Sequence, residues 1–257
     1  MTRENATVYQ ILNGDSLAQG FPVAQTGGEI IVVREALIDG SLDGTGLGEF
    51  WQTRAGYVGI SSDEYRTRVA SEFEKILRAP PGSEFNLWFE YDLFCQVNMW
   101  FVLSLIASLP SPKQVWAVYP SFLSWKHPHF WSGFGAATAG ELLKSFRDRI
   151  PLNKNEIQLG QRLWQAYKNS NLEELTKLSA YKSASLPYLQ PVVQAHTDRF
   201  PQEGAKGRPE SILEEIIRTG PGDFQSVFVA FSKREPIYGF GDNQLKAIYD
   251  RVRKDVK

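Results

Sequence analysis

Residues 85–119 read FNLWFEYDLFCQVNMWFVLSLIASLPSPKQVWAVY and contain two short apolar runs separated by a longer one. The short runs, Phe85–Phe89 and Val115–Tyr119, are rich in β-branched and aromatic residues, which is typical of strands buried on both faces. The run between them, Asp92–Leu109, is apolar almost all round and predicts a buried helix. A strand, a buried helix and a second strand in this order favour a parallel sheet.

Two more strands are expected before this stretch, at Val8–Leu12 and Ile30–Val33. Between the second and third strands, residues 61–64 (SSDE) offer a capping box, and apolar residues then follow at helical spacing: Tyr65, Val69, Phe73 and Ile76. We therefore predict an α/β chain with an open, mostly parallel, doubly wound sheet of about four or more strands. Helices flank this sheet, and an all-helical C-terminal part follows it.

Three parts of the chain are expected. Residues 1–135 form the α/β domain with the candidate ligand site, and residues 136–200 form a helical extension that packs on it. Residues 200–208 (FPQEGAKGR) are rich in glycine and charge and predict a linker. Residues 207–257 then predict a small helical subdomain whose order resembles a winged-helix unit, with two helices, an extended piece at Pro236–Phe240 and a final helix.

Composition excludes some classes of protein. The 257 residues carry a net charge of -1, which argues against a chain built mainly to coat nucleic acid or an anionic membrane. Cys95 is the single cysteine, so an internal disulfide is impossible and a reducing compartment is favoured. The apolar run Met99–Leu109 is far shorter than the about 20 residues of a membrane span, and residues 1–7 do not resemble a signal peptide. We expect a cytoplasmic protein with no membrane contact.

Polar clusters follow the first three expected strands. They are the Asn13-Gly14-Asp15-Ser16 turn, the Arg34-Glu35 pair, and Glu90 with Asp92. In an open parallel sheet, ligands bind beyond the carboxyl ends of the strands, where loops lead into helices. The sequence therefore predicts a ligand site at this edge, although each cluster alone also has a structural explanation. Asp15 or Ser16 could cap a helix beginning at Leu17, Asp92 could cap the next helix, and Arg34 and Glu35 could form an ion pair with each other or with Glu90.

Roles in the predicted site follow from side-chain chemistry. Arg34 would hold an anionic group, and a carboxylate would transfer a proton, the candidates being Asp15, Glu35, Glu90 and Asp92. Asn13, Gly14, Ser16 and Gln96 complete the predicted ligand-binding set. Gln96 and Asn98 lie on a very apolar helix, so their amides need partners at a strand end or on a ligand. No metal site and no particular cofactor is predicted.

Other conspicuous residues receive structural interpretations. Cys95 is expected to be a small core residue rather than a nucleophile. His127 and His129 could ligate a metal, but no third ligand is signalled nearby, and the aromatic loop around them suits a lid or an interface equally well. His196 lies on the apolar face of a helix and is expected to be a satisfied core residue. Gly44, Gly46 and Gly48 do not have the spacing of a dinucleotide-binding loop.

Four motifs in order carry a family resemblance: ILNGDSLA, EIIVVREALIDG, EFWQTRA and LWFEYDLFCQVN. With them the chain resembles the bacterial family catalogued as domain of unknown function 1835, and QAHTDRFPQEG and GFGDNQL resemble the helical domain that commonly follows it. Val33 and Ser41 depart from the pattern, where an aromatic residue and a proline are expected. The resemblance implies no activity, but it makes these residues motif positions: Asn13, Gly14, Asp15, Ser16, Arg34, Glu35, Glu90, Asp92 and Gln96.

Two functions are compatible with these features. The first is a small-molecule enzyme or binding protein whose site at the carboxyl edge of the sheet takes an anionic or nucleotide-like ligand. The second is a regulatory or interaction protein whose C-terminal helices bind nucleic acid or a protein partner. A basic stripe of Lys246, Arg253 and Lys257 would favour the second function. A second copy of the chain is a further possible partner.

Overall fold

The computed structural model describes residues 7–110, 113–123, 133–201, 204–220 and 223–255. Its centre is a five-stranded sheet in the order β2-β1-β3-β4-β5. Four strands are parallel, and each lies within a residue or so of its predicted position: β1 (Val8–Asn13), β2 (Glu29–Val33), β3 (Glu84–Trp88) and β4 (Gln114–Val118). The predicted fold class, a mostly parallel sheet with flanking helices and a helical C-terminal part, is confirmed.

The fifth strand corrects the expectation that residues 136–200 are all helical. β5 (Ile150–Leu152) pairs antiparallel with β4 at the edge of the sheet. It has three residues, and the central one is Pro151, which cannot donate a ladder hydrogen bond and is tolerated at a sheet edge. Such a short segment shows no alternation that could be read from the sequence.

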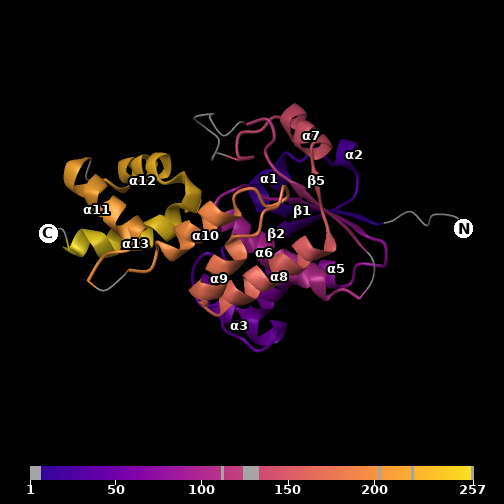
Figure 1. Cartoon of the computed structure of the whole chain (residues 1–257), viewed down its shortest axis with the longest axis horizontal. Coiled ribbons are helices and arrows are strands. Elements are labelled where there is room, and N and C mark those ends of the chain that lie inside the picture. Colours follow the sequence, from indigo (N-terminus) through magenta and orange to yellow (C-terminus); the bar gives the residue numbers. More distant parts are fainter. Residues whose placement is uncertain (1–6, 111–112, 124–132, 202–203, 221–222, 256–257) are drawn as a thin grey trace, which may run out of the picture.

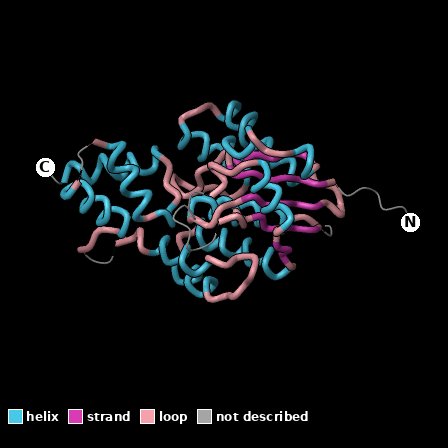
Figure 2. Tube along the Cα trace, turned by 90° about the horizontal axis from the view of Figure 1, so that it is seen from above, coloured by secondary structure: helices cyan, strands magenta, loops and turns pink. Residues whose placement is uncertain are grey.

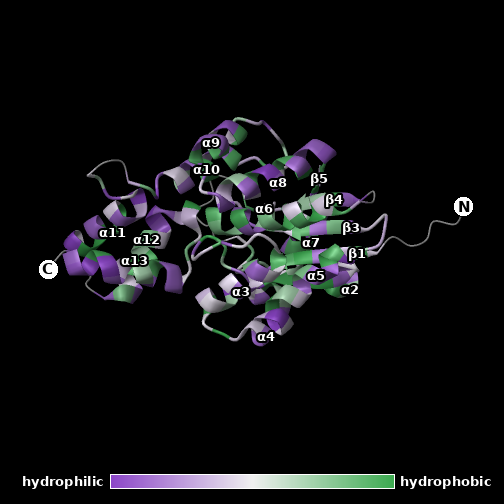
Figure 3. Cartoon of the chain, turned by 90° about the horizontal axis from the view of Figure 1, so that it is seen from below, coloured by the Kyte–Doolittle hydropathy of each residue, from purple (hydrophilic) through white to green (hydrophobic). Residues whose placement is uncertain are grey.

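Alternate side chains of the strands enter two separate cores. Tyr9, Ile11, Phe85 and Leu87 join the larger core with the helices α3 (Leu47–Val58), α5 (Ser71–Leu77), α6 (Leu93–Ser108) and α8 (Lys154–Lys168). The opposite face is covered by α1 (Asp15–Gln19), α2 (Val23–Thr26) and α7 (Ala139–Arg147) (Figure 1). Figure 3 shows that the strands and α6 are the most apolar elements, while the outer helices carry polar faces. Both faces of the sheet are therefore covered, as a parallel sheet requires.

The predicted helix between β2 and β3 is confirmed but contains an irregular turn. Its parts are α4 (Ser62–Tyr65), the π-helical segment η1 (Arg66–Ala70) and α5. Ser61 caps it by accepting a hydrogen bond from the backbone of Glu64. The four apolar residues that predicted this helix are all buried.

The described residues after α8 form six more helical elements: α9 (Leu172–Ser179), α10 (Leu189–Thr197), α11 (Arg208–Thr219), α12 (Phe224–Arg234), the 3₁₀ helix η3 (Pro236–Tyr238) and α13 (Asp242–Asp255). The extended piece expected at Pro236–Phe240 is therefore wrong, and the described part of residues 204–255 contains no strand that could form a wing. Figure 2 shows α11–α13 beyond the carboxyl ends of the parallel strands. Among the described residues, no helix is long and apolar enough to span a membrane.

Candidate functional site

The carboxyl ends of β1, β2 and β3 lie side by side, so the three predicted polar clusters meet at one edge of the sheet. Asn13 is in register with Val33, and Leu12 is in register with Trp88. The side chains that follow do not form one group, however. They divide into an exposed ion pair, a buried ion pair and a buried hydrogen-bond network.

The turn after β1 corrects the capping interpretation of Asp15 and Ser16. α1 begins at Asp15 itself, its N-cap is Gly14, and no side chain caps it. Gly14 has φ 97°, a backbone conformation that residues with a Cβ rarely adopt, so glycine is needed here to bend the chain out of the strand. Asp15 and Ser16 are consequently exposed, while Asn13 and Gly14 are half-buried.

The exposed ion pair joins Arg34 to Asp15, which corrects the expected pairing of Arg34 with Glu35. Arg34 Nε donates to both carboxylate oxygens of Asp15, at 2.8 and 3.0 Å. Its Nη1 donates to the carbonyl of Arg68 at 3.0 Å. Because both side chains of the pair are partly exposed, the pair contributes little to stability and can exchange partners.

The buried ion pair joins Glu35 to Arg54, a residue that the sequence analysis did not single out. Both side chains are fully buried, and Arg54 Nη2 lies 2.7 Å from Glu35 Oε2. Arg54 also donates to the carbonyls of Ala36, Asp39 and Ser41, and the Tyr65 hydroxyl donates to Glu35. These contacts fix the loop that follows β2, so Glu35 has a structural role whatever else it does.

The strand-end network, as we call it, consists of Asn13, Glu90, Asp92, Cys95, Gln96 and Asn98. Glu90 is its half-buried centre: the Cys95 thiol donates to Glu90 Oε2 at 2.7 Å, and the backbone of Phe134 donates to Oε1 at 2.9 Å. Asp92 caps α6 through the backbone of Cys95 at 3.0 Å, as predicted. One cysteine thus connects the two carboxylates.

The amides of the strand-end network find partners at the neighbouring strand ends. Asn98 donates to Asn13 Oδ1 at 2.9 Å and to the carbonyl of Glu35 at 2.7 Å. Asn13 donates in turn to Cys95 Sγ at 3.0 Å, and Gln96 donates to the carbonyl of Glu90 at 2.7 Å. The predicted need of these buried amides for partners is therefore met within the protein, and the network spans β1, β3 and α6.

Burial changes the protonation of two groups in the network. Removal from water, together with the charge of Glu90, raises the pKa of Asp92 to about 7. The same causes raise the pKa of the Cys95 thiol well above its ordinary value, so Cys95 stays protonated, in keeping with the expectation that it is not a nucleophile.

The described residues also include one cluster with the donor atoms of a metal site, Glu90, Asp92 and Cys95, whose atoms lie within 4.8 Å of one another. A cation there would have to displace the protons of Asp92 and Cys95.

His127 and His129 lie outside the described residues. His196 is buried as predicted but is not satisfied, because neither ring nitrogen has a hydrogen-bond partner among the described residues.

Compared with known proteins, this chain matches no protein-family model, no curated protein and no solved structure.

Proposed function

We propose that this chain binds a small anionic or nucleotide-like molecule at the carboxyl edge of its sheet, where Asp92 and Glu90 transfer a proton. The observation that carries the proposal is the paired carboxylates of the strand-end network, since burial and the charge of Glu90 bring the pKa of Asp92 to about 7. A group with a pKa near neutrality can both give and take a proton at physiological pH. A capping residue on a helix needs no such pKa.

The solvent access and the charges at the strand ends also support a ligand site at this edge of the sheet. Glu90, Asn13 and Gly14 are half-buried and so reach the surface, whereas Asp92 is buried and only 5% exposed. Arg34 stands at the same edge in an exposed pair with Asp15, and a phosphate or carboxylate of a ligand can replace Asp15 as its partner. Ser16 and the Asp15 carboxylate would lie at the mouth of the site. Glu35 is left out of the proton transfer because Arg54 and Tyr65 engage it.

The alternative, binding of nucleic acid by the C-terminal helices, gains less support from the contacts. Of the predicted basic stripe, Lys246 is paired with Asp250, Arg253 donates to the Tyr249 hydroxyl, and Lys257 lies outside the described residues. Two further arginines of these helices are also paired, Arg251 with Glu210 and Arg218 with Glu214. Cations that already face carboxylates offer little to a phosphate backbone.

A cytoplasmic location remains part of the proposal and rests on a single buried cysteine with no disulfide partner.

The test is a thermal-shift screen of the wild-type protein and two variants against nucleotides, sugar phosphates and divalent metal ions. Arg34→Ala removes the proposed anion anchor, and Arg218→Ala removes an exposed arginine of α11 as the matched control. A ligand at about 100 times its dissociation constant stabilises by roughly 2.7 kcal/mol, which shifts the melting temperature measurably. We expect at least one phosphate-bearing compound to stabilise the wild type and Arg218→Ala more than Arg34→Ala.

Glu90→Gln separates binding from proton transfer. It keeps the size of the side chain and one of the two accepting oxygens but removes the ionisable carboxylate, so we expect the ligand still to bind while the pH dependence of its affinity changes. A screen in which no compound stabilises the wild type would contradict the proposal. Equal stabilisation of Arg34→Ala and Arg218→Ala would remove Arg34 from the site.

A further inference from the structure

Two adjoining cavities lie away from the strand-end network, where the loop after β2 approaches α10 and the C-terminal helices. One has a volume of about 180 Å³ and the other about 300 Å³. Asp39, Arg199 and Phe200 line both of them. Together they form a hollow that is contributed by three separate parts of the chain, the kind of junction at which ligand sites are common.

A buried histidine lines the larger cavity, and its ring nitrogens have no hydrogen-bond partner among the described residues. This residue, His196, is only 4% exposed. Burial and the nearby charge of Arg199 lower its pKa to about 3, so the imidazole is neutral and offers one donor and one acceptor. Buried polar groups are nearly always hydrogen-bonded. Because both nitrogens are closed off from the cavity, a ligand or a water there can supply the missing hydrogen bonds only after a small movement of the ring.

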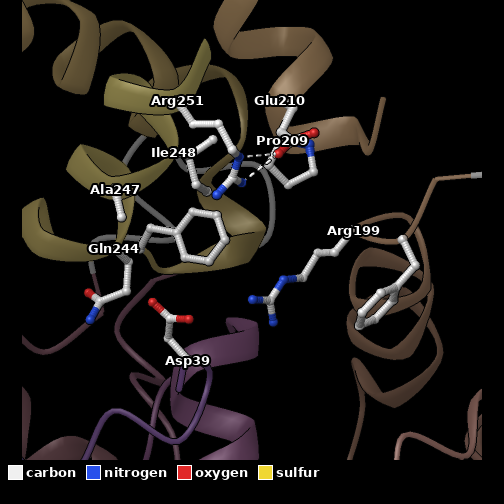
Figure 4. Close-up of a pocket in the computed structure, with 10 residues that line it drawn as sticks. Asp39, Arg199, Pro209, Glu210, Gln244, Ala247, Ile248 and Arg251 are labelled. Carbon is white, nitrogen blue, oxygen red and sulfur yellow. Dashed lines mark hydrogen bonds and ion pairs between the residues drawn. The ribbon is translucent and has the colours of Figure 1, made fainter. Parts of the chain in front are cut away.

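An arginine and a carboxylate face the smaller cavity from opposite elements. Figure 4 shows the Arg199 guanidinium and the Asp39 carboxylate directed into the hollow, with no ion pair drawn between them. Arg199 has no salt bridge to any described carboxylate, whereas Arg251 on the far wall is held by Glu210. The Asp39 carboxylate accepts a hydrogen bond from the backbone of Gly40 and interacts with the Tyr57 hydroxyl, but it has no ion-pair partner among the described residues.

Apolar surface lies beside these two charges. The ring of Phe240 lies 5.6 Å from the Arg199 guanidinium, and Phe200 and Ile248 complete this part of the wall. The hollow therefore presents a cation and an anion that have no ion-pair partner among the described residues, although Arg199 also contacts the Tyr167 hydroxyl. A neutral imidazole and an apolar surface lie beside them. A simple phosphate would match the cation alone and would be repelled by Asp39.

We propose that this hollow binds a free α-amino acid with an apolar side chain. The guanidinium of Arg199 would take the carboxylate in a two-pronged hydrogen bond, and Asp39 would take the ammonium group. The side chain would lie against the aromatic rings, and His196 would complete its hydrogen bonds with the polar end of the ligand or with a water that the ligand fixes. This site is separate from the one at the strand ends and does not depend on the proposed function.

The first experiment measures the melting temperature of the full chain with each of the twenty amino acids at millimolar concentration. We expect one or more apolar amino acids to raise it. Calorimetric titration then compares the best amino acid with its amide, which lacks the carboxylate, and with its deaminated acid, which lacks the ammonium group. Each should bind about tenfold or more weakly than the amino acid, since a charge-assisted hydrogen bond is lost.

Variants separate this site from the strand-end site. Arg199→Ala and Asp39→Asn should weaken amino-acid binding by about tenfold to a hundredfold, while Glu90→Gln and Arg218→Ala leave it unchanged. His196→Leu should fold at least as stably as the wild type, because it removes two unsatisfied nitrogens, yet bind the amino acid less tightly.

Three results would overturn the inference. In the first, no amino acid raises the melting temperature. In the second, the deaminated acid or inorganic phosphate binds as tightly as the amino acid, which would leave Asp39 without a role. In the third, Arg199→Ala, Asp39→Asn and His196→Leu all keep wild-type affinity, which would place the ligand elsewhere.

Discussion

Arg54 brings five N–H donors into a region that excludes water, and its partners must therefore come from the protein. Glu35 and three backbone carbonyls supply them. Arg34 directly precedes Glu35 in the chain and is also an arginine, but its ion pair with Asp15 stays partly exposed. The ion pairs of Arg54 and Arg34 therefore allow a buried charge and a partly exposed charge to be compared in the same protein.

We expect Arg54→Ala to lower the free energy of unfolding by about 3 to 5 kcal/mol, because it leaves the Glu35 carboxylate buried without its cation. Arg34→Ala should lower it by about 1 kcal/mol or less. Urea denaturation of the two variants and the wild type measures the difference. Similar values for both would mean that water reaches Glu35 and that the pair does not hold the loop after β2.

Asp92 gives the stability of the protein a pH dependence of unusual sign. Its pKa rises from 3.8 in the unfolded chain to about 7 in the folded state, so between these values the folded state holds the proton more tightly. Its contribution is therefore fully present below about pH 4 and is lost as the pH rises through about 7. Asp92→Asn keeps the cap of α6 but cannot ionise.

We expect the wild type to lose stability relative to Asp92→Asn between about pH 4 and pH 7, by an amount on the order of a few kcal/mol. The comparison with the variant cancels the contributions of the surface carboxylates, which have the opposite sign. Urea denaturation across this range measures it. Parallel curves for the two proteins would show that Asp92 is ionised throughout.

At the scale of elements, α6 and α8 pack closely where they cross because one residue at the crossing is a glycine. Gly160 lies in the buried face of α8, and a Cβ there would approach the Cβ of Leu103 to 2.6 Å. Gly56 in α3 is also helical, but it is exposed and has nothing within 4 Å of its Cβ position. The two glycines differ in packing and not in secondary structure.

Gly56→Ala should raise the free energy of unfolding by up to about 1 kcal/mol, because alanine favours the helix. Gly160→Ala gains the same propensity but forces α6 and α8 apart, and we expect a net loss of about 1 to 3 kcal/mol. Chemical denaturation of both variants tests the prediction. Stabilisation of both would show that the Leu103 side chain moves aside without strain.

Elements with a strong pattern could be predicted from the sequence, and those set by tertiary contacts could not. The parallel strands and α6 are apolar runs bounded by turn residues, so their positions were predictable. β5 could not be predicted because three residues around a proline show no period, and η3 could not because a short 3₁₀ turn and an extended piece have similar sequences.

The same distinction holds for the candidate site. Strand order brings the predicted clusters to one edge, but the pairings across that edge depend on side-chain directions that the sequence does not show. Arg54 is the one charged residue of the stretch 51–58 (WQTRAGYV), and this was the available signal of a buried pair. The ring nitrogens of His196 lack hydrogen-bond partners among the described residues, and a sequence does not show which polar groups come within reach of a side chain.

At the scale of the whole molecule, the C-terminal helices contact the sheet edge through a glycine. Gly239 follows η3 with φ 61°, and a Cβ on it would overlap the carboxylate of Asp92. The turn between α12 and α13 therefore lies directly against the strand-end network and keeps water from it. The desolvation that raises the pKa of Asp92 depends in part on this contact.

We expect Gly239→Ala to separate the turn from Asp92 and to lower the free energy of unfolding by about 1 to 3 kcal/mol more than Gly59→Ala does. Gly59 is the matched control, because it has a similar left-handed backbone at the end of α3 and nothing within 4 Å of its Cβ position. Water admitted beside Asp92 lowers its pKa, so Gly239→Ala should also lose less stability than the wild type between about pH 4 and pH 7. Urea denaturation at both pH values measures the two effects together. Equal losses in Gly239→Ala and Gly59→Ala, with an unchanged pH dependence, would mean that the C-terminal helices do not govern the environment of Asp92.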